Sequence, residues 1–499
     1  MRRTIFPFKI ILILFCTCFF SCQELEDINQ NSNSLTEMPD NYLFTNAAKW
    51  SCSEARQLLS RTQIFFTGSW SHLYSTPYAE DRYDFNADTD DEDLVWRDLY
   101  STELRNACVL VKITGEGGTN PNAVRNAMAQ IVSFITYVKL TDLFGSVPYT
   151  EGGKGFSGDI ITPAYDTQEF IYHDIITRLG DCINVFETGN EADGYGAADP
   201  FYGGKLDKWI KFANSFRLRL AMRMRFADPS GAATAITACL GKPLMESNDD
   251  NARIRNFEAT STYLYSGWYE TFQNEGKSCR PSRMLIDFLK STDDPRLPVF
   301  AIANTSGNYE GMPNGITAAA RALIADGDIS KWQPVMYAKT IPSYWLCYSE
   351  VCFLKAEAVL YSLGGSGANT HYQNGIRAAM AQWGVSEAQI SHFLATEPEA
   401  TLTGNTEDNF RKVCTQLWLS CVTNNYEAYN VVRRTGYPVV PVRTGNEDPE
   451  LALGITSGQL PGRMTYPSTE VTMNKANYDA AVAAQGADVR TTKVWWDAK

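Results

Sequence analysis

The stretch LDKWIKFANSFRLRLAMRMRF, residues 206–226, has the periodicity that decides the fold class of this 499-residue chain. Its apolar residues recur every three or four positions, which is the spacing of one face of an α-helix. That face comprises Leu206, Trp209, Ala213, Phe216, Leu220 and Met224. Seven basic residues crowd the same stretch, and in an acidic protein we expect them to pair with carboxylates rather than bind an anion. They are Lys205, Lys208, Lys211, Arg217, Arg219, Arg223 and Arg225.

Helical spacing continues on both sides of this segment. One predicted helix starts with Asn120 as its cap and Pro121 at its first position, and ends near Phe144. Another opens with Asp166 and Glu169 as a capping pair. Further helical segments are predicted at 44–66, 232–240, 282–290, 348–360, 371–383, 387–394 and 408–421.

Two stretches lack this periodicity. Residues 251–342 predict short strands and turns around a single helix, and residues 433–467 are rich in Pro and Gly. The sequence therefore predicts a mostly α fold, in which paired helices form a repeat scaffold beside a loop-rich, irregular half.

The N-terminus reads as a lipoprotein signal. Arg2, Arg3 and Lys9 precede an apolar segment, Ile10–Phe20, which is too short to span a bilayer and ends just before Cys22. We expect cleavage before Cys22 and acylation of its thiol, the alternative being a plain secretory signal. The predicted organisation is a signal peptide at 1–21, a lipidated tether at 22–41 and a single domain at 42–499.

Composition and motifs exclude several classes of function. The net charge is −13, and −16 without the basic residues of the signal peptide, which argues against nucleic acid as a partner. The nine cysteines after Cys22 form no C-x-x-C pair, and the four histidines lack metal-ligand spacing. The acidic run Asp88–Asp93 lacks the glycine of a calcium loop, so we expect a solvated loop there. We expect no cofactor and no metal ion.

Aromatic residues are the main candidates for ligand binding. Residues 65–100 contain nine aromatic side chains, and a second cluster spans 263–272. Flat rings can cover the C–H face of a sugar while nearby polar groups bind its hydroxyls. Most such rings are core residues in any protein, and Phe65, Phe66 and Tyr100 are expected to be. Our candidates for ligand contact are Trp70, Tyr74, Tyr83, Trp96 and Trp268.

Seven stretches, in order along the mature chain, resemble the SusD/RagB family of nutrient-binding outer-membrane lipoproteins. They are ELEDINQNSNS (24–34), LTDLFGSVPYTE (140–151), KWIKFANSFRLRLAMR (208–223), DFLKSTDDPRLPVF (287–300), YSEVCFLKAEA (348–358), NYEAYNVVRRTGYP (425–438) and RMTYPSTEVTMNKANY (463–478). The resemblance implies a scaffold of TPR-like helix pairs. It also implies binding of a nutrient, most often a glycan, at the cell surface and a SusC-like TonB-dependent transporter as partner.

The stretches that carry the resemblance read as scaffold, so no ligand-binding residue can be transferred from them. The predicted function is capture of an oligosaccharide by a non-catalytic lipoprotein on the outer membrane, facing the cell exterior. Two alternatives stay open: a peptide cargo in the same family, and a lipid-anchored glycosidase with two carboxylates in a cleft.

Overall fold

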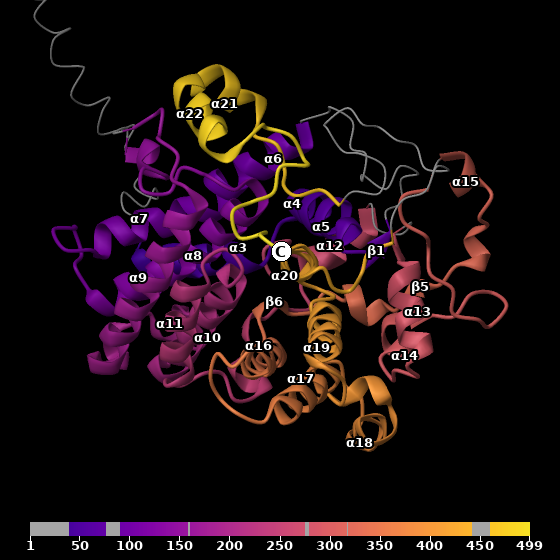
Figure 1. Cartoon of the computed structure of the whole chain (residues 1–499). Helices are drawn as coiled ribbons and strands as arrows, with labels where there is room; N and C mark the ends of the chain where they lie inside the picture. Colours follow the sequence, from indigo (N-terminus) through magenta and orange to yellow (C-terminus); the bar gives the residue numbers. More distant parts are fainter. Residues whose placement is uncertain (1–38, 76–89, 158–159, 275–278, 317, 442–459) are drawn as a thin grey trace, which may run out of the picture.

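The computed structural model describes residues 39–75, 90–157, 160–274, 279–316, 318–441 and 460–499. Helices dominate it, as predicted (Figure 1). The helices of the scaffold are α3 (Asp40–Cys52), α7 (Arg105–Thr114), α8 (Ala123–Phe144), α9 (Gln168–Thr188), α10 (Leu206–Met224), α11 (Pro229–Leu240), α16 (Tyr348–Leu360), α17 (Ala368–Gln382), α18 (Glu387–Thr396), α19 (Thr406–Ser420) and α20 (Asn425–Thr435).

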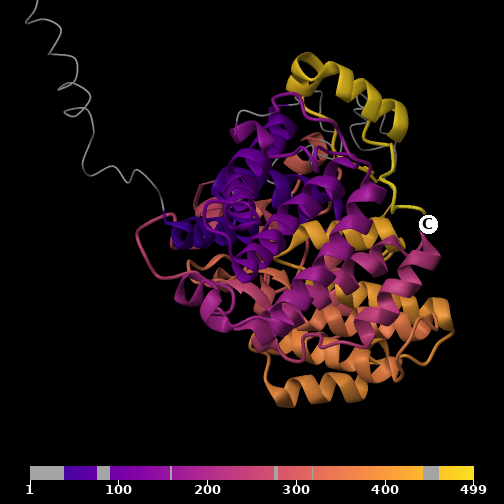
Figure 2. The ribbon, with the colours of Figure 1, turned by 90° about the vertical axis from the view of Figure 1, so that its left-hand side faces the viewer.

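These helices pack side by side in sequential pairs, as the repeat pattern predicted. α7 packs on α8, α8 on α9, α9 on α10 and α10 on α11, and a second set joins α16 to α17 and α19 to α20. Contacts between α10 and α16 link the two sets. In both views the helices α16 to α19 lie at the opposite end of the molecule from α21 (Ser468–Met473) and α22 (Lys475–Gln485) (Figures 1 and 2).

The remaining elements are short, in agreement with the predicted irregular half. The prediction of a single helix within residues 251–342 was wrong, because the described part of that region contains four short α-helices. The strands form three two-stranded antiparallel sheets, β1 with β3, β2 with β6 and β4 with β5. Their bounds are β1 (Tyr74–Ser75), β2 (Ala252–Ile254), β3 (Arg280–Pro281), β4 (Ala301–Ile302), β5 (Lys331–Trp332) and β6 (Ser343–Leu346). The short helices are α4 (Arg56–Leu59), α5 (Thr67–Trp70), α6 (Asp90–Asp98), α12 (Gly267–Asn274), α13 (Arg283–Ser291), α14 (Leu297–Phe300) and α15 (Ala318–Ala322), with π-helical turns at Ser60–Phe66 and Leu99–Leu104.

The apolar face of α10 is buried as predicted, and six of the seven basic residues pair with carboxylates. The pairs are Lys205–Glu191, Lys208–Asp250, Lys211–Glu246, Arg219–Glu350, Arg223–Asp142 and Arg225–Glu357. Arg217 differs, because its Nε donates to the carbonyl of Ile176 at 3.0 Å.

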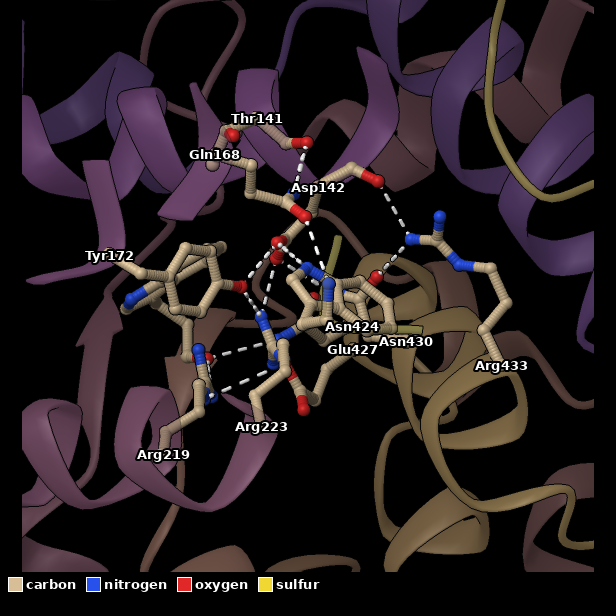
Figure 3. A network of polar contacts seen from close by, with 12 residues as sticks. Thr141, Asp142, Gln168, Tyr172, Arg219, Arg223, Asn424, Glu427, Asn430 and Arg433 are labelled. Carbon is tan, nitrogen blue, oxygen red and sulfur yellow. Dashed lines mark hydrogen bonds and ion pairs between the residues drawn. The ribbon is translucent and has the colours of Figure 1, made fainter. Parts of the chain in front are cut away.

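Asp142 on α8 is the centre of a buried polar network (Figure 3). Its carboxylate accepts hydrogen bonds from Tyr172 of α9 and Arg223 of α10, and from Asn430 of α20 at 2.9 Å. Trp496 also donates to it, at 2.9 Å. Four donors satisfy a buried carboxylate fully, so this network ties three scaffold helices and the C-terminal segment to α8. Most of these residues belong to the stretches that resemble the family, which we interpreted as scaffold.

Several local predictions were wrong. The predicted helix at 44–66 is broken, since α3 ends at Cys52 and α4 begins only at Arg56. The cap of α8 is Asn122 rather than Asn120, because its Oδ1 reaches the amide of Arg125 at 3.0 Å. Thr167, not Asp166, caps α9. The predicted solvated acidic loop is wrong in its described part, because α6 begins at Asp90 and Glu92 is fully buried against Arg490 at 2.9 Å.

α8 is long and apolar enough to cross a membrane by composition alone, but 94% of its apolar window is buried inside the fold. It is therefore a core helix. The described cysteines, all nine of those after Cys22, are unbonded and mostly buried, in agreement with their expected role as small apolar residues.

Candidate ligand-binding site

The loop between α8 and α9 separates two neighbouring pockets. Asp166, instead of capping α9, accepts hydrogen bonds from the amides of Tyr149 (3.2 Å) and Thr150 (2.7 Å), which fixes this loop against the start of α9. Tyr100 adds a bond from its hydroxyl to the carbonyl of Pro148 at 2.7 Å. The backbone at Gly152 and Gly153 then forms a wall shared by the two pockets.

Glycine is required at Gly153 on two grounds. Its φ is +77°, a conformation that other residues rarely adopt, and a Cβ atom there would lie 2.6 Å from Sγ of Cys108. The loop can approach α7 this closely only without a side chain.

The aromatic pocket lies on one side of the wall and has a volume of about 340 Å³. The Trp96 ring packs among Tyr100 (5.0 Å between centroids), Phe144 (5.0 Å) and Tyr165 (6.1 Å, stacked). The residues lining the pocket are Trp96, Tyr100, Pro148, Glu151, Gly152, Gly153, Gly155, Ile160, Ile161, Pro163 and Glu470. An aromatic floor with two carboxylates at its edge suits a ligand that has both an apolar face and hydroxyl groups.

Both carboxylates already hold the pocket together. Glu151 accepts from the amide of Ala164 at 2.7 Å. Glu470 accepts from the Tyr165 hydroxyl at 2.7 Å and from Asn474 at 3.0 Å. Each keeps lone pairs for a ligand hydroxyl, because a carboxylate offers about four acceptor positions.

The polar pocket, on the other side of the wall, has a volume of about 540 Å³. Its lining residues are Cys108, Val111, Lys112, Ser133, Tyr137, Tyr149, Thr150, Gly152, Gly153, Lys154, Asp174 and Arg178. Tyr149, Asp174 and Arg178 form a hydrogen-bonded cluster here, which we call the pocket triad. The Tyr149 hydroxyl donates to Asp174 at 2.5 Å, and Arg178 donates to the Tyr149 oxygen at 3.1 Å.

Burial raises the pKa of Tyr149, so its hydroxyl stays protonated at neutral pH. Arg178 is only partly buried, and it also donates to Gln130 at 2.9 Å and lies 4.9 Å from the Phe134 ring. The triad thus presents an oriented donor and an oriented acceptor to the pocket. We call the two pockets, together with the wall that they share, the split groove.

One of the five predicted ligand-contacting residues lines the split groove. Trp96 does so, with 7% of its surface exposed. Trp70, Tyr74 and Trp268 are buried in the core, where Tyr74 stacks on Trp268 at 5.6 Å. Tyr83 and the predicted lipidation site Cys22 lie outside the described residues.

Sequence reasoning missed most of the groove. Tyr100 was expected in the core but is half-buried at the pocket. Asp174 and Arg178 are spaced four residues apart like an ordinary pair on a helix surface. Pro148, Tyr149, Thr150 and Glu151 stood in LTDLFGSVPYTE and Glu470 in RMTYPSTEVTMNKANY, two stretches that we had interpreted as scaffold. Among the described residues, no group of three His, Cys, Asp or Glu side chains could hold a metal ion.

Comparisons with known proteins agree with this architecture. A family model described as "Starch-binding associating with outer membrane" matches residues 32–467. A solved structure of a "chitin-binding protein" superposes with a TM-score of 0.80 at 29% identity, over 93% of this chain and 100% of the other.

Two more distant structures show the same fold. A SusD homologue from Bacteroides uniformis has a TM-score of 0.78 at 24% identity, covering 93% and 100% of the two chains. A chitin-binding SusD homologue from Flavobacterium johnsoniae has a TM-score of 0.79 at 23% identity, covering 92% and 98%. No curated protein matches significantly.

Proposed function

Because the chain belongs to the SusD-like family, we propose that it is a carbohydrate-binding protein of nutrient uptake that holds its ligand in the split groove. The observation that carries this proposal is the pairing of an aromatic floor at Trp96 with the pocket triad across one shared wall. A pyranose ring would cover the Trp96–Tyr100 side with its C–H face, while Arg178 and Asp174 bind hydroxyl or amide groups of the next sugar.

The ligand to test first is a chito-oligosaccharide. The solved chitin-binding protein shares 29% identity with this chain, and its whole length is covered. An N-acetylated sugar also suits the polar pocket, since its amide offers a donor to Asp174 and an acceptor to Arg178. Starch-derived oligosaccharides form the matched comparison, because the family description names starch.

We further propose that Cys22 carries a lipid anchor and that a SusC-like TonB-dependent transporter receives the ligand. Residues 24–41 would keep the domain within ~60 Å of the outer membrane even when fully extended. Such confinement raises the effective concentration of a neighbouring transporter. Mild detergent extraction followed by purification through a tag at Lys499 should recover a large β-barrel protein. Recovery of this chain alone, with ligand present, would count against the partner.

The test of the function is calorimetric titration of the purified protein with chito-oligosaccharides and with malto-oligosaccharides. We expect one series to bind, and Trp96→Ala to weaken binding by about 1–3 kcal/mol, or roughly 5- to 150-fold. Trp268→Phe is the matched control, because it alters a buried ring away from the groove and should leave affinity unchanged.

Two alternatives are outcomes of the same experiment. Chromatography of the incubated sugars reports cleavage, which would indicate a glycosidase using Glu151 and Glu470. Binding of short peptides but of neither sugar series would indicate a peptide cargo and overturn the proposal.

A further inference from the structure

A separate pocket of about 370 Å³ lies where the end of α3 meets α4 and the start of α12. Two aromatic side chains line it, Trp50 and Tyr265, and both are half-buried. Trp50 packs edge-on with Tyr263 at 5.9 Å, and Tyr265 packs edge-on with Tyr269 at 5.5 Å. Each ring is therefore held in place by one neighbour while it still borders the pocket.

The polar residues of this pocket include a buried cation. Lys49 is 5% exposed, and its Nζ donates to the amide oxygen of Asn256 at 2.6 Å. Among the described residues no carboxylate lies within ion-pair distance of this ammonium, and Glu270, which also lines the pocket, has no basic partner there. A buried charge without a counter-charge is costly, so the pocket gains from polar groups that a ligand would bring.

Helix α6 connects this pocket to the split groove. Trp96 lines the aromatic pocket and Asp98 lines the pocket at Trp50. Successive helix residues are about 100° apart around the axis, so these two side chains project from nearly opposite sides of α6. Arg97 lies between them with 65% of its side chain exposed, and it donates to Asp98 at 3.0 Å. α6 also packs against α4, which borders the second pocket (Figure 1).

We propose that the pocket at Trp50 and Tyr265 is a second saccharide-binding site, and that one extended oligosaccharide crosses α6 over Arg97 to occupy it together with the split groove. This inference rests on the proposed function. A chain of several sugars is needed to cross a helix about 10 Å in diameter, whereas a disaccharide fits within the split groove alone. Occupying two pockets with one ligand makes the second contact intramolecular, which raises affinity for long chains only.

The experiment compares chitobiose with chitohexaose on five variants of the full chain. Trp50→Ala, Tyr265→Ala and Arg97→Ala should weaken hexasaccharide binding by about 5- to 50-fold and leave disaccharide binding unchanged. Leu264→Ala, at an exposed residue next to Tyr265, should bind both sugars like the wild type. Tyr265→Phe keeps the ring, and it should retain most of the hexasaccharide affinity.

Thermal unfolding of each variant confirms that it is folded. If hexasaccharide affinity stays at the wild-type value in folded Trp50→Ala and Tyr265→Ala while Trp96→Ala weakens both sugars, the second site is refuted and the proposed function stands. If the wild type binds neither sugar, the chitin assignment fails, and this extension of it fails too.

Discussion

The core and the split groove contain the same three kinds of side chain in the same arrangement. In the core, Tyr172 and Arg223 both donate to Asp142, and Arg223 lies 3.5 Å from the Tyr172 oxygen. We call these residues the buried triad. In the pocket triad, Tyr149 donates to Asp174, and Arg178 lies within hydrogen-bond distance of both.

The two triads differ in what surrounds them. Asp142 has two further donors, Asn430 and Trp496, and Arg223 has a second carboxylate in Glu427. The pocket triad borders a cavity of about 540 Å³. The buried triad is therefore structural, because protein groups satisfy all of its polar atoms. The pocket triad has one open side, so its polar atoms can bind a ligand.

We expect the largest difference between the two triads in the free energy of unfolding of their arginine variants. Arg223→Ala leaves Asp142 and Glu427 buried without their cation, so we expect a loss of about 3–5 kcal/mol in the free energy of unfolding. Arg178→Ala removes a partly exposed pair and should cost less than about 1 kcal/mol. Chemical denaturation measures both, and equal losses would remove the distinction between the triads.

A second buried cluster tests whether burial determines the protonation state of a carboxyl group in the core. Lys139 bonds both Glu54 (2.9 Å) and Glu103 (3.1 Å), so two carboxylates share one ammonium. Burial raises the pKa of Glu103 to about 8, against a partial lowering by Lys139. Protonation of Glu103 therefore contributes fully to the free energy of unfolding below pH 4.5, the usual pKa of a glutamate. This contribution is lost as the pH rises towards 8, by at most about 1.4 kcal/mol per pH unit.

Glu103→Gln should remove that dependence, since glutamine cannot ionise and still offers Lys139 an oxygen. We expect the stability of the variant to improve relative to the wild type as the pH rises from about 5 to 8. Denaturation midpoints across this range give the measurement. Parallel profiles for the two proteins would mean that Glu103 keeps its charge in the core.

The smallest effect should appear in the pocket triad. Asp174→Asn keeps an acceptor for Tyr149 but removes the charge, so we expect ligand affinity to fall by about 0.5–1.5 kcal/mol, or roughly 2- to 15-fold, with stability unchanged. Titration with the bound oligosaccharide measures the change. A stability loss as large as that of Arg223→Ala would show that this triad is structural as well.

The sequence predicted most of the scaffold helices, although not α7 or α20, and it did not predict the site. The spacing of Leu206, Trp209 and Phe216 predicted α10 within two residues of its observed end, because an apolar stripe must face the core. Aromatic content could not separate Trp70 from Trp96, since a ring stacks equally well on a neighbour or on a ligand. Whether a side chain is structural or free to bind a ligand depends on partners that are distant in the sequence. Glu92, for example, pairs with Arg490, which lies 398 positions away, and no local sequence pattern predicts that contact.

The bond between Trp496 and Asp142 has a consequence for how the protein is made. Synthesis delivers residue 142 long before residue 496, so the centre of the core stays incomplete until residue 496 has been made. The buried ion pair of Glu92 likewise forms only once Arg490 has been made. Full compaction of the core is thereby coupled to synthesis of the C-terminal segment. A chain released after Val489 should remain open to protease digestion under conditions in which the complete chain resists it.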